Sequence, residues 1–190
     1  MTKKTKLIGL TGYAGSGKDT VRDCLDDLGW HGLALADPIR LMVGEMLDSA
    51  NISRKWMMTR ELKEQTIPEL GVSYRALAQT LGTEWGRKTV SPMLWIRMAQ
   101  AYMDSTCTAA RPVGGFDKFV VSDIRFANEA QWIRDQGGAI WRIERPQAVP
   151  VRAHVSEAEI YHFAADAVIV NDGTFDQLWY NVIAALEATV

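Results

Sequence analysis

Residues 9–20, GLTGYAGSGKDT, decide the fold of this chain. Gly12, Gly17 and Lys18 stand at the spacing G-x-x-x-x-G-K, after the apolar run 6–10 and before a segment of helical periodicity. In a strand, loop and helix in that order, glycines let the backbone close around phosphate oxygens, and the N–H groups of the loop and helix N-terminus favour negative charge. The stretch predicts a phosphate-binding loop, with Lys18 reaching the β- and γ-phosphates of a nucleotide. The alternative is an ordinary glycine-rich turn.

Asp19 departs from the usual pattern, in which Ser or Thr follows the lysine and touches Mg²⁺. A carboxylate there is either a ligand of Mg²⁺, directly or through water, or a first-turn acidic residue that the helix dipole favours. Thr20 supplies the adjacent hydroxyl, which could bond a phosphate or cap the turn. Both roles of Asp19 stay open at the level of the sequence.

The composition is that of a globular protein with one core, because the chain has 190 residues, of which 47% are hydrophobic and 23% charged. A net charge of −2 gives no general attraction to nucleic acid or to an anionic membrane, so neither is expected as a partner. The apolar N-terminal run breaks at once into the glycine loop, and no run reaches about 18 apolar residues, so neither export nor a membrane span is expected. Cys24 and Cys107 have no metal-binding spacing and fit reduced thiols of a cytoplasmic protein.

Apolar strand patterns alternate with helical ones along most of the chain. The expected strands are residues 6–10, 31–36, 118–123, 139–144 and 167–172. Strand–helix alternation predicts a mostly parallel sheet covered by helices on both faces. The helical stretch 37–108 is too long for a simple crossover, and we expect its helices over the mouth of the site, where a second substrate could bind.

Local signals set the expected helix ends. Asp37 is expected as an N-cap before a proline, and residues 91–92 repeat that pattern. One helix is expected over 73–87, with Trp85 on its apolar side. Thr174 begins a capping box before the last helix.

Asp123 ends the expected strand 118–123, and ligands of open α/β sheets bind at the carboxyl ends of strands. Its carboxylate could orient Mg²⁺ or its water, or alternatively cap the helix that begins near Arg125. Trp95 would either stack on a base or belong to the core. Phosphoryl transfer also needs positive groups on the migrating phosphate. The candidate arginines are Arg40, Arg75, Arg87, Arg125, Arg142, Arg145 and Arg152.

Six stretches occur in a familiar order: GLTGYAGSGKDTV, ALADPIR, YRALAQTLGTEWGR, VVSDIRFANEAQWIR, HVSEAE and VIVNDGTFDQLW. Together they resemble the deoxynucleoside monophosphate kinases of tailed bacteriophages and their prophage relatives, from residue 6 to about 186. The resemblance implies one domain, residues 1–190, with an α/β three-layer P-loop NTPase fold and a mostly parallel sheet. It also implies an acceptor-binding helical region at about 37–108 and a lid at about 142–157.

The same resemblance implies transfer of the γ-phosphate of ATP to a deoxynucleoside monophosphate (dNMP), giving the diphosphate. For a phage-encoded enzyme this reaction would serve DNA precursor synthesis in the cytoplasm of the host. The small-molecule dNMP is the expected partner, ATP and Mg²⁺ the expected cofactors. Which base is accepted, whether ribose is excluded and whether the chain forms a homodimer stay open.

Roles follow residue by residue from the resemblance and the loop pattern. ATP would be held by Gly12, Ala14, Gly15, Ser16, Gly17, Lys18, Asp19 and Thr20. The metal would be held by Asp19 and Asp123. The acceptor would be held by Asp37, Arg40, Arg75, Gln79, Arg87 and Trp95. Catalysis would rest on Lys18, Asp123, Arg125, Arg145 and Arg152.

Two other functions fit the phosphate-binding loop alone. One is a different small-molecule kinase on the same scaffold, such as a dephospho-coenzyme A kinase. The other is a P-loop regulator or nucleic-acid-handling ATPase, against which the acidic net charge and the lack of a basic tract count.

Overall fold

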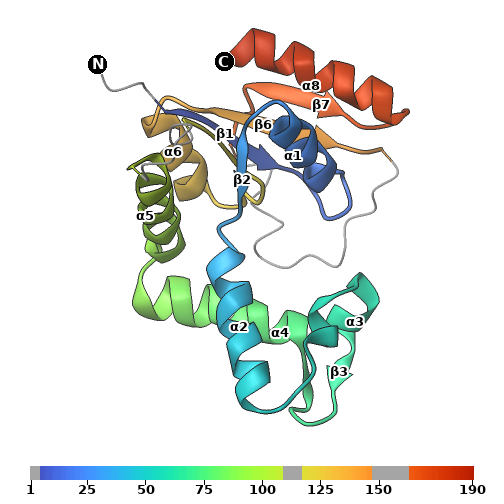
Figure 1. The fold of residues 1–190 in the computed structure, drawn as a ribbon, viewed down its shortest axis with the longest axis vertical. Coiled ribbons are helices and arrows are strands. Elements are labelled where there is room, and N and C mark those ends of the chain that lie inside the picture. The colour runs from blue at the N-terminus through green and yellow to red at the C-terminus, as the bar shows by residue number, and fades with distance from the viewer. Residues whose placement is uncertain (1–4, 109–116, 147–162) are drawn as a thin grey trace. The chain divides into compact units, whose positions relative to one another are not determined.

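The computed structural model describes residues 5–108, 117–146 and 163–190 (Figure 1). The chain divides into two compact units. We call Met1–Ala34 together with Ala99–Val190 the sheet unit, and Leu35–Met98 the helical unit. The single domain expected from the sequence stays a prediction.

In the described residues, the sheet unit is built on five strands. They are β1 (Lys6–Thr11), β2 (His31–Leu33), β5 (Lys118–Val121), β6 (Ala139–Glu144) and β7 (Ala167–Val170). Their order is β2-β5-β1-β6-β7, and every neighbouring pair is parallel. The chain leaves β1 toward one edge and later returns to the other side of β1, so the central strand is the switch point where open α/β sheets bind ligands. The mostly parallel sheet predicted from the sequence is confirmed.

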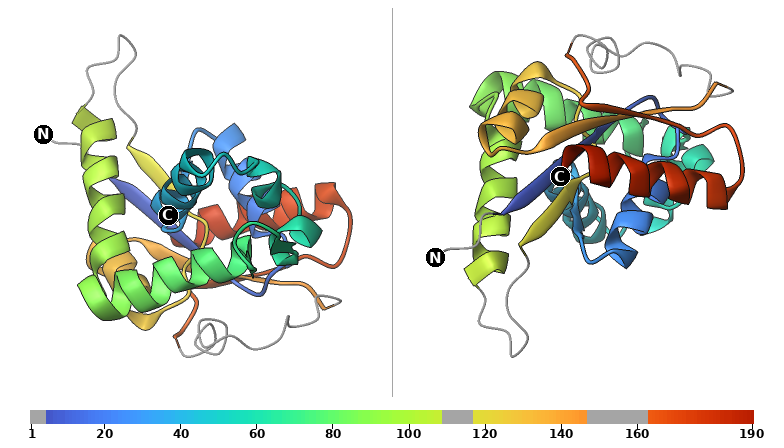
Figure 2. Two further views of the ribbon diagram at one scale, coloured as in Figure 1. Left: turned by 90° about the horizontal axis from the view of Figure 1, so that it is seen from below. Right: turned by 90° about the horizontal axis from the view of Figure 1, so that it is seen from above.

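Helices cover both faces of this sheet. They are α1 (Lys18–Asp27), the C-terminal part of α5 (Leu94–Thr108), α6 (Ala127–Asp135) and α8 (Phe175–Thr189). Neighbouring residues of a strand point to opposite faces. Ile8 and Leu10 of β1 therefore pack with α1 and α8, whereas a Cβ at Gly9 would meet Ile133 of α6. The right-hand view of Figure 2 shows α6 across the strands from α8.

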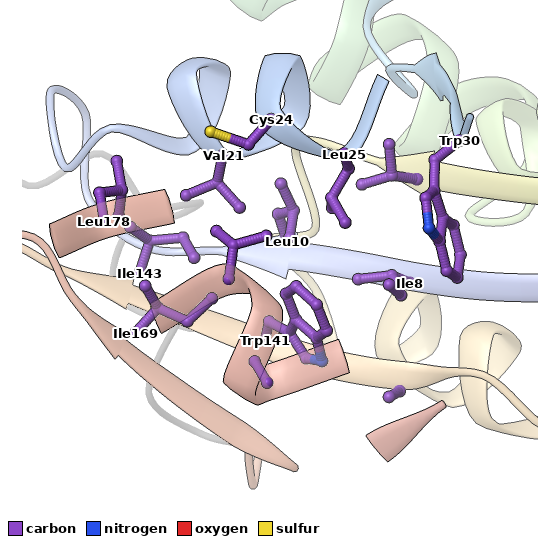
Figure 3. Packing of buried hydrophobic residues seen from close by; sticks show 14 residues of the cluster. Ile8, Leu10, Val21, Cys24, Leu25, Trp30, Trp141, Ile143, Ile169 and Leu178 are labelled. Carbon is purple, nitrogen blue, oxygen red and sulfur yellow. The ribbon is translucent and has the colours of Figure 1, made fainter. Parts of the chain in front are cut away.

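The core between the sheet, α1 and α8 is close-packed (Figure 3). Val21 and Leu25 point from α1 toward the strands, and Leu178 of α8 belongs to the same cluster. Trp141 of β6 is wholly buried, and its indole N–H donates to Thr189 Oγ1 at 3.0 Å. This packing fixes the end of β1, and with it the start of the glycine loop.

The helical unit contains α2 (Asp37–Ser49), η1 (Arg54–Met57), α3 (Arg60–Glu64), α4 (Tyr74–Gln79), the π-helix η2 (Thr80–Val90) and the start of α5. A short antiparallel pair, β3 (Thr66–Ile67) and β4 (Val72–Ser73), lies between α3 and α4. The small core of the helical unit consists of Val43, Leu47, Ile52, Trp56, Ile67 and Tyr74. The sequence did not predict this hairpin.

Several expected helix ends were wrong in the helical unit. Asp37 is the first residue of α2 and not its N-cap, because Ala36 occupies the cap position and the Asp37 carboxylate accepts from Arg40. The helix predicted over 73–87 becomes α4 followed by η2. Its wider turns break the 3.6-residue period, so Trp85 is 43% exposed instead of facing the core. The helix expected from residue 91 begins at Leu94.

In the sheet unit, the predicted ends of strands and helices lie within a few residues of the observed ones. The strands predicted over 31–36 and 167–172 are shorter, and α6 begins at Ala127. Thr174 accepts from the N–H of Gln177 at 3.3 Å, as the predicted cap requires. Among the described residues, no helix has both the length and the apolar character needed to cross a membrane.

Candidate nucleotide-binding and phosphoryl-transfer site

The glycine loop follows β1 and has the backbone that only glycine adopts easily. Gly12, Gly15 and Gly17 have φ of 142°, 81° and 102°. A Cβ at Gly12 would lie 2.3 Å from the carbonyl oxygen of Ile143, and one at Gly17 would lie 2.2 Å from Asn171 Nδ2. Ile143 of β6 and Asn171, just after β7, therefore lie against the loop. Gly12 is required by space as well as by φ, because the atom that a Cβ would meet is backbone; at Gly17 it is the end of the Asn171 side chain.

Lys18 begins α1 and folds over the loop. Its ammonium donates to the carbonyl oxygens of Gly12 at 2.7 Å and Tyr13 at 2.8 Å. The residue before the helix is Gly17, which has no side chain to cap the first-turn N–H groups. A cation and a helix N-terminus meet at one loop, and this combination binds anions.

Two hydroxyls at the loop are deeply buried. Thr11 is 0% exposed and Ser16 is 1% exposed. In the described part of the chain, neither side-chain oxygen has a hydrogen-bond partner. A buried hydroxyl without a partner costs about 1–3 kcal/mol, so such groups are expected where a ligand or water completes the site.

A pocket of 360 Å³ opens beside the loop. Its lining residues are Tyr13, Ser16, Ile143, Glu144, Arg145, Pro146 and Val170. Pockets of roughly 300–1,000 Å³ are typical of small-ligand sites. Arg145 directly follows β6, which brings this predicted residue to the pocket beside the loop.

Asp123 lies next to the start of the loop. Val121 of β5 is in register with Gly9 of β1, and the N–H of Ile124 donates to the carbonyl of Leu10 at 3.0 Å. Asp123 is half-buried. It does not cap α6, because Phe126 holds that position. The backbone of Asp123 therefore lies beside the start of the loop, and its role toward a metal ion stays a prediction.

Glu129 was not identified from the sequence. It is 4% exposed on α6, and its Oε2 accepts from the N–H groups of Arg125 at 2.9 Å and Phe126 at 3.1 Å. A buried carboxylate that accepts two backbone N–H groups fixes the turn carrying Asp123 and Arg125. The Arg125 side chain itself is exposed.

The metal ion implied by the fold can be tested against these carboxylates. Half-buried Asp123 beside the loop offers the hard oxygen ligand that Mg²⁺ prefers. Asp19 is different, because its side chain is 85% exposed and lies 3.7 Å from Arg22 in the first turn of α1. Across residues 5–108, 117–146 and 163–190, no three acidic, histidine or cysteine side chains gather as a metal-ligand group. The site fits an ion held by one carboxylate together with nucleotide phosphates and water.

Five of the six expected acceptor residues, all except Trp95, lie on α2, α4 and η2 of the helical unit. Arg40 NH1 donates to Asp37 Oδ1 at 2.6 Å, and Arg75 pairs with Glu64. Arg75 and Gln79 are four residues apart on α4 and share one helix face. The remaining acceptor candidate, half-buried Arg87, lies on η2.

Tyr74 lies among these residues and was not identified from the sequence. Burial raises the pKa of its phenol, and the nearby charge of Arg40 acts in the opposite direction. Its ring belongs to the core of the helical unit.

The Trp95 side chain is buried within the helical unit. It is 3% exposed, and its indole N–H donates to the carbonyl of Gly82 at 2.8 Å. A Cβ at Gly86 would lie 2.3 Å from its ring. Of the two roles considered for Trp95, the structure favours the core, because no ring face is left for a base.

Two candidate arginines remain, Arg142 and Arg152. Arg142 is inside β6, where its NH2 group donates to the carbonyl of Phe163 at 2.8 Å, which is a structural contact. The lid expected over 142–157 therefore starts within a strand. Its residues 147–157, with Arg152, lie outside the described residues.

Solved structures with a similar architecture show the fold class. TT1252 from Thermus thermophilus superposes with a TM-score of 0.52 at 20% identity, over 99% of this chain and 100% of that one. Shikimate kinase from Aquifex aeolicus superposes with a TM-score of 0.52 at 14% identity, over 95% of this chain and 96% of that one. At these identities the likeness shows the fold alone, which is the α/β P-loop fold.

Sequence relatives give the family. Residues 55–182 match the model of the deoxynucleotide monophosphate kinase family, and the chain belongs to that family. A protein of Acanthamoeba polyphaga mimivirus, provisionally named a deoxynucleotide monophosphate kinase, is 28% identical over 198 residues, which cover 95% of this chain and 96% of that protein. The deoxynucleotide monophosphate kinase of Escherichia phage RB69 is 30% identical over 112 residues, which cover 58% of this chain and 43% of that protein. As a member of a kinase family, the chain is an ATP-dependent phosphotransferase with a nucleotide acceptor and a divalent metal ion.

Proposed function

We propose that this chain transfers the γ-phosphate of ATP to a dNMP, producing ADP and the deoxynucleoside diphosphate. The observation that carries the proposal is the family match over residues 55–182. The glycine loop at residues 12–18 lies outside that match and adds independent support, because its geometry suits a nucleotide triphosphate. In an infected cell, the product would supply DNA synthesis.

The sheet unit would bind the donor. The phosphates of ATP would occupy the loop from Gly12 to Thr20, with Lys18 released from the loop carbonyls to reach the β- and γ-phosphates. The nucleoside part of ATP would lie in the pocket beside Tyr13 and Arg145. A pocket of 360 Å³ accommodates part of a nucleotide, with the rest open to solvent.

Asp123 would hold Mg²⁺ through water, beside the phosphates. The ion, when bound, supplies positive charge to the phosphate oxygens. Asp19, which is exposed on the first turn of α1, would contribute to the water shell of the ion or only to the helix terminus. Glu129 would keep Asp123 and Arg125 in place through the backbone of their turn.

The helical unit would bind the acceptor. Arg40, Arg75 and Arg87 would bind the monophosphate, since guanidinium groups match phosphate oxygens in charge and geometry. Asp37 and Glu64 already hold two of these guanidinium groups, which reduces the side-chain freedom lost on binding. Gln79, on the same face of α4 as Arg75, would contact the nucleoside.

The chemistry needs no general base, because a phosphate oxygen of the acceptor is already ionised at neutral pH. This oxygen would attack the γ-phosphorus in line, and the bond from that phosphorus to the bridging oxygen would break, releasing ADP. Lys18 and Arg125 would stabilise the charge on the migrating group, joined by Arg145 and Arg152 on closure. Catalysis is then positioning and charge stabilisation.

The test is a panel of acceptors with ADP formation as the readout. The four dNMPs and their ribose counterparts are compared with dephospho-coenzyme A and shikimate. A reaction with protein and ATP but no acceptor measures ATP hydrolysis. The proposal expects ADP formation that depends on at least one dNMP. Turnover with dephospho-coenzyme A alone would identify the other kinase considered, and acceptor-independent hydrolysis would identify an ATPase.

A further inference from the structure

Asn171 connects the end of β7 to the glycine loop. Its backbone N–H donates to the carbonyl of Glu144, the last residue of β6, at 2.7 Å. Its side-chain Nδ2 donates to the carbonyl of Ser16 at 2.9 Å. The residue is therefore held by β6 through its backbone and holds the loop through its side chain.

The contact is specific in direction and tight in space. A carbonyl oxygen only accepts hydrogen bonds, so the side chain must present its NH₂ group to Ser16. A Cβ at Gly17 would lie 2.2 Å from the same Nδ2. Gly17, with φ of 102°, is thus the residue that lets this amide approach the loop.

Fixing one carbonyl also fixes the N–H of the same peptide. In a trans peptide, the C=O of Ser16 and the N–H of Gly17 point in opposite directions in one plane. A flip of the Ser16–Gly17 peptide changes ψ of Ser16 and φ of Gly17, and glycine tolerates such a change of φ. A flip would exchange the N–H for a carbonyl oxygen, which repels phosphate.

We propose that Asn171 is a positioning residue for the donor site: its amide prevents the Ser16–Gly17 peptide from flipping and so keeps the Gly17 N–H facing the ATP phosphates. The inference rests on the proposed function only in taking ATP as the ligand of the loop. It requires neither a dNMP nor turnover.

Asn181 provides a matched control. It is a half-buried residue of α8 whose Nδ2 donates to the carbonyl of Val170 at 3.1 Å. This is the same kind of amide-to-carbonyl bond near the end of β7, but it is made to the strand and not to the loop. Removing it tests what loss of such a bond does to the fold alone.

The experiment measures binding of ATP and of adenosine by calorimetry on the full chain, with no acceptor present, together with the melting temperature. Asn171→Ala is expected to weaken ATP about tenfold, as loss of one hydrogen bond plus freedom to flip would do, and to leave adenosine unchanged. Asn181→Ala is expected to bind both ligands as the wild type does. Unchanged ATP affinity in Asn171→Ala would overturn the proposal, and so would an equal loss for ATP and adenosine.

Asn171→Asp gives a second, isosteric test that does not depend on how the alanine variant folds. It places a carboxylate against the Ser16 carbonyl, where donation is lost and repulsion takes its place, so ATP binding should fall more than in Asn171→Ala. Wild-type ATP affinity in Asn171→Asp would overturn the proposal. Wild-type ATP binding is measured in the same series. A chain that binds ATP but phosphorylates no dNMP would refute the proposed function, whereas the inference about Asn171 would still be decided by the ATP affinities of its variants.

Discussion

The sheet unit and the helical unit encode their candidate sites in different ways. In the sheet unit, the functional backbone lies at the end of a buried strand, and Ile143 of β6 and the Asn171 side chain lie against the loop at Gly12 and Gly17. In the helical unit, charged side chains stand on short helices around a small core. The difference suggests that phosphate binding by the loop depends on backbone shape together with one cation, Lys18, whereas acceptor binding depends on side-chain charge alone. Substitutions should therefore act differently in the two units.

Lys18→Ala should have the largest effect on turnover. It removes the charge that would meet the β- and γ-phosphates, and loss of one such stabilising group costs about 10²–10³ in rate. Lys6→Ala, at the opposite end of β1, is the control and should keep wild-type turnover. The melting temperature checks that both variants fold, and full activity in folded Lys18→Ala would contradict the role of the loop.

Gly12→Ala and Gly15→Ala distinguish a steric clash of the new Cβ from the strain of a positive φ. Both glycines have positive φ, but only at Gly12 would the new Cβ meet a backbone atom, the carbonyl oxygen of Ile143. We expect a loss of about 2–4 kcal/mol in unfolding free energy for Gly12→Ala, and about 1 kcal/mol for Gly15→Ala. Chemical denaturation measures both. Equal losses would show that contact with β6 does not shape the loop.

Gly86→Ala and Gly44→Ala make the corresponding comparison in the helical unit. A Cβ at Gly86 would meet the buried Trp95 ring, whereas one at Gly44 would meet the guanidinium of Arg54, the flexible end of a surface side chain. Gly86→Ala should lose about 1–3 kcal/mol of unfolding free energy, and Gly44→Ala should be neutral or gain up to about 1 kcal/mol from helix propensity. A neutral Gly86→Ala would contradict the packing role of Trp95.

Tyr74→Phe should give the smallest effect, visible only at alkaline pH. Burial raises the pKa of Tyr74 in the folded chain, so its contribution is fully present below the unfolded pKa of about 10 and is lost as pH rises through the folded pKa. Wild-type stability should fall by more than that of Tyr74→Phe as the pH rises above about 10, and the two profiles should run parallel at lower pH. Profiles that stay parallel at alkaline pH as well would show that this phenol does not titrate with unfolding.

The sequence predicted the sheet unit well for a physical reason. Its central strands β1, β5 and β6 are mostly buried, and the loop needs glycine at fixed positions, so the apolar runs and residues 6–20 carry a clear signal. Trp85 could not be placed, because the π-helix breaks the period on which the prediction relied. Glu129 was missed because Phe126, and not Ser or Thr, occupies the N-cap three residues before it, so the usual capping-box pattern is absent. Asn171 was missed because it bonds the backbone of Ser16, which is far away in the sequence. A buried carboxylate and a side-chain amide give no pattern of their own.

The fate of the γ-phosphate tests the central claim most directly. Purified chain is incubated with γ-labelled ATP, Mg²⁺ and a mixture of the four dNMPs, and the labelled products are separated. If the glycine loop presents ATP to a bound nucleotide, the label appears in a deoxynucleoside diphosphate, and Lys18→Ala loses that product. Label found only in inorganic phosphate, or only in ATP, would contradict the account.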